Sequence, residues 1–316
     1  MQKRILWRCF LIIPTALVAS AVIFAVMRIL PNDVVRSIAG DVPLNAETRE
    51  SLEAELGLNE DLHIQYMKWL KSIAMGEFGG HSLATGKPIG LMISRQLPVT
   101  ILLAIYAMAL SLLLSLPAGV LSAVWKGSRF DKIVMVYSAV GIATPHLVLA
   151  VGILLWLVVV LQWSPPIIYS MPWVDPWNHI QMVFWPAVII SWERSSNIVR
   201  VTRASLIESL GQPYINTAKG KGIPYIYIVL RHAIPNSLMP IITIVTIEFG
   251  ALLSGILIVE TIFGLPGIGR GLVQAAVSRD YPVVQTLSLI LVTLSLIVSL
   301  ASDIGHQIVD PRVSAL

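Results

Sequence analysis

Long apolar stretches, each about the length needed to cross a bilayer, alternate along the chain with more polar segments of varied length. Six such stretches occur, at residues 9–30, 98–124, 133–161, 182–199, 237–260 and 283–301. A helix of about 20 apolar residues spans the ~30 Å hydrocarbon layer of a membrane. The pattern therefore predicts an all-α integral membrane protein with six transmembrane helices.

The amino-acid composition supports the prediction of a membrane protein. Of the 316 residues, 56% are hydrophobic and 13% are charged, whereas a soluble domain has about 25% charged residues. The single cysteine, Cys9, excludes a disulfide framework and a cysteine-based zinc site. The sequence contains no charged tail or low-complexity segment, so we expect contact with membrane lipid and none with nucleic acid.

The first stretch, within residues 1–30, follows Lys3, Arg4 and Arg8. A cleaved signal peptide has the same order, but its apolar core has only about 7–15 residues and ends at a small-residue cleavage site. The greater length here favours a retained first transmembrane helix behind a cytoplasmic N-terminus.

Residues 31–97 are more polar and are predicted to form an extracytoplasmic helical insert. Asn45 and Asn59 are suited to cap two helices, the first of which ends before Gly57. In the second helix, large residues recur near helical spacing, namely Leu62, Tyr66, Trp69, Leu70 and Ile73. This stripe favours packing against the membrane domain over ligand binding.

A phosphate-binding loop is suggested superficially by Gly86 and Lys87. That motif requires a glycine where His81 stands and a serine or threonine where Pro88 stands. We therefore reject nucleotide binding in this segment.

Residues 98–310 are predicted to form the transmembrane core, which contains a long basic loop at 200–235. Lysines and arginines cluster in the N-terminal leader and after the second and fourth apolar stretches, but not after the third. Because positive charge favours the cytoplasmic side, both termini, loop 200–235 and the tail 311–316 are predicted to be cytoplasmic.

Polar residues inside the predicted spans are candidates for lining a transport path, namely His146, Glu193, Glu248 and Ser254. A charge at membrane depth costs about 2.5–3.5 kcal/mol and needs a partner or a water-filled cavity. Glu193 and its neighbour Arg194 are also compatible with the bilayer edge or a partner subunit. Ser254 stands among small residues that allow close packing. His146, beside Pro145, favours a hydrogen bond at a helix break over a metal site, and no bound metal is expected.

A short polar segment at 211–222 separates the fourth and fifth apolar stretches. Pro213 fits the first turn of a helix, where its missing N–H is not needed. Gly220 and Gly222 are suited to end that helix within about two turns. The small side chain of Ala218 leaves a face that another protein could approach closely.

This segment resembles the cytoplasmic EAA loop in the membrane subunits of bacterial ABC importers. The residues that carry the resemblance are Asn216, Thr217 and Ala218 in place of the Glu-Ala-Ala triplet, Gly222 at the family spacing, and Ile234 and Pro235 at the end of the loop. Residues 200–208 and 217–222 resemble the dipeptide, oligopeptide and nickel branch of that family.

A turn between the fifth and sixth apolar stretches also resembles this branch. Its residues are Glu260, Phe263, Pro266, Gly267, Gly269 and Arg270. Its glycines alone are a weak nucleotide-binding signal, because no strand–helix–strand unit surrounds them. The physical interpretation is a tight extracytoplasmic turn in which glycine supplies a positive φ and Pro266 fixes the bend.

The resemblance implies the type I ABC importer permease fold and a subunit without catalytic residues or a cofactor of its own. It implies a homologous second permease subunit, two ATPase subunits that bind ATP and Mg, and a periplasmic or lipid-anchored solute-binding protein at the bacterial cytoplasmic membrane. The implied cargo is a di- or oligopeptide, a nickel chelate or an opine. The implied ATPase-coupling residues are Pro213, Tyr214, Asn216, Thr217, Ala218, Lys219 and Gly222.

Two other classes of protein fit the sequence less well. An intramembrane enzyme needs a nucleophile–base pair or a metal cluster, but the six histidines are scattered and no His-Glu-x-x-His motif occurs. An ATP-independent channel or secondary transporter usually contains internal repeats with paired broken helices, which this sequence does not display.

Overall fold

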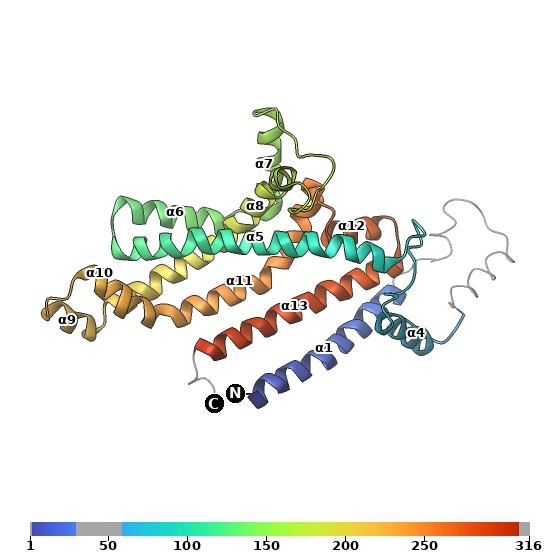
Figure 1. Ribbon diagram of the computed structural model, residues 1–316, viewed down its shortest axis with the longest axis horizontal. Coiled ribbons are helices and arrows are strands. Elements are labelled where there is room, and N and C mark those ends of the chain that lie inside the picture. The colour runs from blue at the N-terminus through green and yellow to red at the C-terminus, as the bar shows by residue number, and fades with distance from the viewer. Residues whose placement is uncertain (1, 30–58, 310–316) are drawn as a thin grey trace. The chain divides into compact units, whose positions relative to one another are not determined.

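The computed structural model describes residues 2–29 and 59–309, and the described residues are helical apart from connecting turns and one isolated bridge between His81 and Pro88 (Figure 1). The helices are α1 (Gln2–Ile29), α4 (Leu62–Ala74), α5 (Ile89–Val124), α6 (Arg129–Ala143), α7 (His146–Val159), α8 (Pro176–Leu210), α9 (Pro213–Gly220), α10 (Tyr225–Ile228), the π-helix η1 (Val229–Ala233), α11 (Ile234–Phe263), α12 (Ile268–Val277) and α13 (Tyr281–Val309). The all-helical prediction is confirmed for these residues.

The described chain forms two compact units. Unit 1 contains residues 101–265 together with the two chain ends, and unit 2 contains the rest of the N-terminal 100 residues and residues 266–297. Helices α1, α5 and α13 each contribute to both units.

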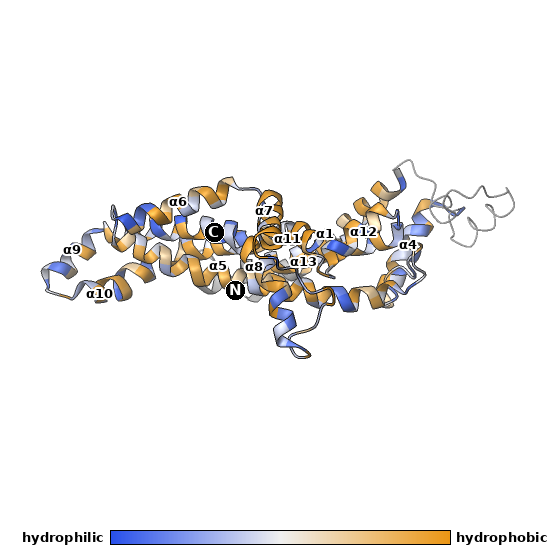
Figure 2. Ribbon diagram, turned by 90° about the horizontal axis from the view of Figure 1, so that it is seen from above, coloured by the Kyte–Doolittle hydropathy of each residue, from blue (hydrophilic) through white to orange (hydrophobic). Residues whose placement is uncertain are grey.

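Several helices are long and apolar enough to cross a membrane. Four segments of the described chain qualify by length and composition, namely Phe10–Arg28, Ile89–Val124, Tyr225–Phe263 and Tyr281–Ala301. A fifth span results if α6 and α7 count as one bent pair. Helix α8 has 35 residues but is not among these apolar segments, because Glu193, Arg194 and Arg200 interrupt its apolar sequence. Figure 2 shows hydrophobic residues along α7 and α11 and hydrophilic ones at α9.

The predicted span 133–161 is not one continuous helix. Thr144, with φ −94° and ψ 114°, and Pro145, with ψ 140°, are both extended, since the residue before a proline is pushed out of the helical region. Helices α6 and α7 consequently meet at 105°. Each has only 14 or 15 residues, so the pair is either a broken span or a re-entrant loop.

Unit 2 is built around apolar residues of α5, α12 and α13. Its core cluster consists of Ile89, Ile93, Ile268, Ala275, Val283, Val284 and Leu287. Helix α5 begins at Ile89, whereas the apolar pattern placed its start at residue 98. Ile89 and Ile93 are buried in this core. Their burial explains why the helix begins before residue 98, in a stretch where polar residues interrupt the apolar pattern.

Helix α4 confirms the second of the two helices predicted within residues 31–97, but its N-cap is Asp61, so the prediction that Asn59 caps it is wrong. Its Tyr66 hydroxyl shares a 2.8 Å hydrogen bond with Ser20 of α1, and the rings of Tyr66 and Trp69 pack near Phe24. The predicted stripe thus includes residues that pack on α1. The helix predicted between Asn45 and Gly57 lies outside the described residues.

The loop before α5 is held by a carboxylate at the start of α13. Asp280 accepts hydrogen bonds from the Ser82 hydroxyl at 2.5 Å and from the backbone N–H groups of Leu83 and Ala84 at 3.1 and 3.3 Å. A carboxylate that receives three hydrogen bonds fixes the loop more firmly than neutral contacts do.

Unit 1 packs its helices closely through small residues on α5, α6 and α8. A side chain added at Gly119 of α5 would lie 2.7 Å from Thr202, and one added at Gly141 of α6 would lie 2.0 Å from Ser196. In addition, Arg203 of α8 donates two hydrogen bonds, of 2.6 and 2.8 Å, to Asp131 of α6. These contacts make α8 the helix on which the rest of unit 1 is assembled.

The link between α7 and α8 is ordered by an aromatic contact. The Tyr169 ring lies 5.5 Å from that of His179, which also contacts the Ser170 carbonyl at 3.0 Å. Burial, with a smaller contribution from Tyr106, raises the pKa of Tyr169 to about 12. The phenol therefore stays neutral in the physiological pH range.

Candidate functional site

Helix α9 confirms the short helix that the sequence predicts in the polar segment. It starts with Pro213 at its first position, and Gln212 before it is extended, with ψ 150°. It ends at Gly220, and Gly222 then adopts φ +73°, a conformation that glycine reaches without steric cost. Helices α9 and α10 connect α8 to α11 at the end of these helices remote from α7 (Figure 1).

One face of α9 is packed against its own chain. Ile215 and Ala218, three residues apart and therefore on the same side of the helix, are 0% and 7% exposed. They join a buried cluster with Ala123, Leu206, Ile228 and Ala233. The expectation that Ala218 leaves a face open to another protein is wrong, because that face is covered by α5, α8, α10 and η1.

The opposite face of α9 is exposed and continues onto the following turn and α10. We call this surface the coupling face, and it consists of Pro213, Tyr214, Asn216, Thr217, Lys219, Tyr225, Ile226 and Tyr227. The Tyr214 hydroxyl hydrogen-bonds to Ser209 of α8 at 2.9 Å. The Lys219 ammonium lies 5.9 Å from the centre of the Tyr225 ring. The exposed aromatic side chains of the coupling face suit a protein partner. Tyr225, Ile226 and Tyr227 were not among the sequence-based candidates.

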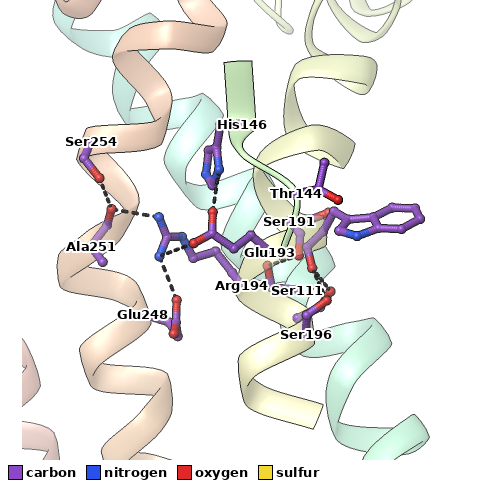
Figure 3. A network of polar contacts seen from close by, with 12 residues as sticks. Ser111, Thr144, His146, Ser191, Glu193, Arg194, Ser196, Glu248, Ala251 and Ser254 are labelled. Atoms are coloured by element: carbon purple, nitrogen blue, oxygen red, sulfur yellow. Dashed lines mark hydrogen bonds and ion pairs between the residues drawn. The ribbon is translucent and has the colours of Figure 1, made fainter. Parts of the chain in front are cut away.

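A second candidate site lies between α7, α8 and α11, where four ionisable side chains form a cluster (Figure 3). We call His146, Glu193, Arg194 and Glu248 the central network. Arg194 donates hydrogen bonds to Glu248 at 2.8 Å and to the Ala251 carbonyl at 3.1 Å. The same carbonyl accepts a 2.8 Å hydrogen bond from Ser254. The four predicted path residues thus lie in or beside one network, while their role as a path lining stays a prediction.

His146 completes the central network from the first position of α7. Its Nδ1 atom contacts the Glu193 carboxylate, and Arg194 lies 4.0 Å from the other oxygen of Glu193. A side chain on Gly255 of α11 would come within 2.5 Å of the His146 ring. Gly255 therefore provides the space that the imidazole occupies. No local sequence pattern predicts the pairing of Arg194 with Glu248, since 54 residues separate them.

Hydroxyl groups fasten the neighbouring part of α8. Tyr137 and Ser195 share a 2.5 Å hydrogen bond, and Ser138 donates to the Ser196 carbonyl at 2.8 Å. Ser111 of α5 donates to the Ser191 carbonyl at 3.3 Å. These contacts join α5 and α6 to α8, and sequence reasoning missed them because single serines carry no distinctive spacing.

The predicted extracytoplasmic turn begins where α11 ends. The residue with positive φ is Gly264, at +70°, and its successor Leu265 donates to the Glu260 carbonyl at 2.9 Å. The expectation that a glycine of this turn supplies the positive φ is therefore confirmed at Gly264, whereas Gly267 has φ −96° and Gly269 lies inside α12. Glu260 and Phe263 are buried in unit 1. Pro266 follows at the start of unit 2, and Arg270 lies on α12.

The described residues combine several apolar helices of bilayer length, a cluster of ionisable side chains between helices (Figure 3) and an exposed polar helix. These features together indicate a polytopic membrane protein. Residues 115–315 match the family described as binding-protein-dependent transport system inner membrane component, and residues 1–104 match its N-terminal family. The chain belongs to this family of binding-protein-dependent transport system inner membrane components.

Named relatives support this membership along nearly the whole chain. The oligopeptide transport system permease protein AppB of Bacillus subtilis is 31% identical over 99% of both chains. The glutathione transport system permease protein GsiC of Salmonella paratyphi A is 29% identical, again over 99% of both. A solved structure, the MetNI methionine ABC transporter in inward-facing conformations, has a TM-score of 0.55 at 18% identity and covers 71% of this chain and 99% of that one. This likeness concerns the fold.

Proposed function

We propose that the chain is a permease subunit of an ATP-driven ABC importer that moves a peptide or a similar small solute into the bacterial cytoplasm. Nickel chelates and opines belong to the same range of solutes. Membership of the binding-protein-dependent transport family carries the proposal. The names of relatives, which include oligopeptide and glutathione permeases, support a small peptide-like cargo.

The proposed topology has six transmembrane helices with both termini in the cytoplasm. Four apolar segments and the bent pair of α6 and α7 supply five of them, and α8 supplies the sixth. Its charged centre is compatible with membrane depth because Arg194 is enclosed and paired with Glu248.

The proposed coupling step uses α9 as a lever. An ATPase subunit docks on the coupling face, while Ile215 and Ala218 hold the other side of α9 in the chain's own core. Because α8 and η1 contribute Leu206 and Ala233 to the same core, displacement of α9 moves α8 and the helix that continues into α11. Interconversion between two packing arrangements of these helices then opens the transport path alternately to the inside and to the outside.

The remaining partners follow from the same proposal. A homologous second permease subunit completes the path, two ATPases bind ATP and Mg, and a periplasmic or lipid-anchored binding protein delivers cargo. This chain binds its partners and transmits movement through its helices, and the partner ATPases hydrolyse ATP.

Site-specific cross-linking tests the coupling step, because Cys9 is the only native cysteine. In a Cys9→Ser background, Thr217→Cys is expected to cross-link to an ATPase subunit in membranes that contain the assembled complex. The matched control is Val174→Cys, which is 72% exposed in the link between α7 and α8 and is expected to react only with reagent added outside. Labelling of Thr217→Cys from outside would refute the proposal.

A further inference from the structure

The members of the central network differ in how far they are enclosed. The side chains of Arg194 and Glu248 are 7% and 6% exposed, whereas that of Glu193 is 28% exposed. Arg194 lies 2.8 Å from Glu248 but 4.0 Å from Glu193. The guanidinium is therefore neutralised mainly by Glu248, and Glu193 is the carboxylate that retains both accessible surface and uncompensated charge.

The contacts of His146 define its charge. Its Nδ1 atom faces the Glu193 carboxylate and so carries a proton to donate, while its Nε2 atom is buried without a hydrogen-bond partner. A proton on Nε2 would place a cationic N–H in the interior with no acceptor, which is less favourable than an unused lone pair of a neutral ring. His146 is therefore neutral, and two carboxylates share one guanidinium.

The resulting excess negative charge needs a counter-charge from outside unit 1. The N-terminus of α7, where His146 is the first residue, contributes only a partial positive charge of about half a unit. A partly exposed carboxylate at membrane depth is not stable against lipid, so its open side faces water, a cation or a polar group of the second permease subunit. A solute that carries a positive group would satisfy this side of Glu193.

We propose that Glu193 is a cargo-contacting residue that binds a primary ammonium group of the transported solute, such as the amino terminus of a peptide. His146 is a positioning residue that orients the Glu193 carboxylate, and the Arg194–Glu248 pair forms the enclosed wall behind it. A carboxylate and an ammonium form a charge-assisted hydrogen bond that a neutral amide cannot match. This inference rests on the proposed function and specifies that the permease selects solutes with a positively charged group.

The test compares two probes that differ only in that charge, tri-alanine and N-acetyl-tri-alanine. The chain is reconstituted in proteoliposomes with its partner permease, ATPases and binding protein, and ATP-dependent uptake of each probe is measured. The quantity compared is the uptake rate of tri-alanine divided by that of N-acetyl-tri-alanine. The binding protein discriminates between the probes equally in all permease variants, so its contribution cancels when this ratio is compared with that of the wild type.

Glu193→Gln is expected to lower this ratio about tenfold, chiefly by slowing uptake of tri-alanine. His146→Asn is expected to lower the ratio less and to retain uptake of the acetylated probe, which a general structural defect would not do. Glu208→Gln is the matched control, because Glu208 is exposed and lies about four turns away on the same helix. Its ratio is expected to equal that of the wild type.

Three results would overturn the inference. An unchanged ratio in Glu193→Gln excludes selection by this carboxylate. Loss of uptake of both probes in Glu193→Gln assigns Glu193 to the transport cycle itself and not to cargo selection. Absence of ATP-dependent uptake of both probes by the wild type excludes small peptides as cargo, and the inference with them, while the proposed function is tested separately by the cross-linking of Thr217→Cys.

Discussion

Gly255→Ala tests whether the space beside α11 controls the position of His146. The added methyl group would stand 2.5 Å from the Cδ2 and Nε2 atoms of the ring, whereas ordinary contacts begin at 3.4 Å. The ring must therefore move by the difference, about 0.9 Å, which disturbs the contact between Nδ1 and the Glu193 carboxylate. Such overpacking costs about 1–3 kcal/mol.

Gly250→Ala is the matched control for this substitution. Gly250 lies on the same helix, and a side chain there would meet nothing within 4 Å. Both variants gain the same helix preference of alanine over glycine, about 0.5–1 kcal/mol. Gly255→Ala is therefore expected to be less stable than Gly250→Ala by the overpacking term alone, about 1–3 kcal/mol.

Thermal unfolding of the purified protein in detergent measures the difference, and a double-mutant cycle assigns its cause. In a His146→Ala background the clash is absent, so Gly255→Ala should cost at least 1 kcal/mol less there than in the wild type, within the range of about 0.5–3 kcal/mol seen for contacting residues. Equal stability of Gly255→Ala and Gly250→Ala, or strict additivity in the cycle, would show that Gly255 does not set the position of His146.

Three further outcomes are expected. Glu248→Gln should destabilise the protein by about 3–5 kcal/mol because it leaves Arg194 enclosed without its partner charge, and Arg194→Met in the same chain should recover most of that loss; no recovery in unfolding temperature would contradict the pairing. Asp280→Asn should weaken the attachment of the loop at Ser82 by about 1–3 kcal/mol, detected as faster proteolysis within residues 81–86 without loss of membrane insertion; unchanged cleavage would refute the attachment. Gly222→Val should impair uptake more than Gly222→Asn, because asparagine tolerates a positive φ and a β-branched residue does not; equal uptake by the two variants would show that the φ of +73° is not required.

The sequence predicted those elements whose signals are local. Pro213 and Gly222 mark the limits of α9 because proline suits a helix start and glycine suits a left-handed residue after a helix end. A helix within residues 31–97 was predicted from the spacing of its large residues, and α4 confirms that helix. Each of these signals arises within about ten residues of chain.

Features that depend on distant parts of the chain were not predictable in this way. The burial of Ala218 results from Ala123 and Leu206, which no spacing within the loop reveals. The proline at 145 predicts a break, but the 105° angle follows from the packing of α6 and α7 on α8. Glu248 was a candidate for a cavity, yet its partner Arg194 lies on another helix, and only the assembled unit shows that it is enclosed.

The coupling helix and the central network are connected through one continuous helix. Leu206 of α8 packs with α9, and Glu193 lies 13 residues earlier on the same helix, about 20 Å away at 1.5 Å per residue. Pro186 lies on the far side of Glu193, so no proline interrupts the intervening segment, and the contacts of Arg203 and Ser196 with α6 stiffen it. If an ATPase displaces α9, this segment of α8 should move as a rigid rod and carry Glu193 with it. Arg194, Glu248 and Glu193 would then shift relative to α7 together, so the contact between His146 and Glu193 is the part of the network that the proposed cycle should make and break.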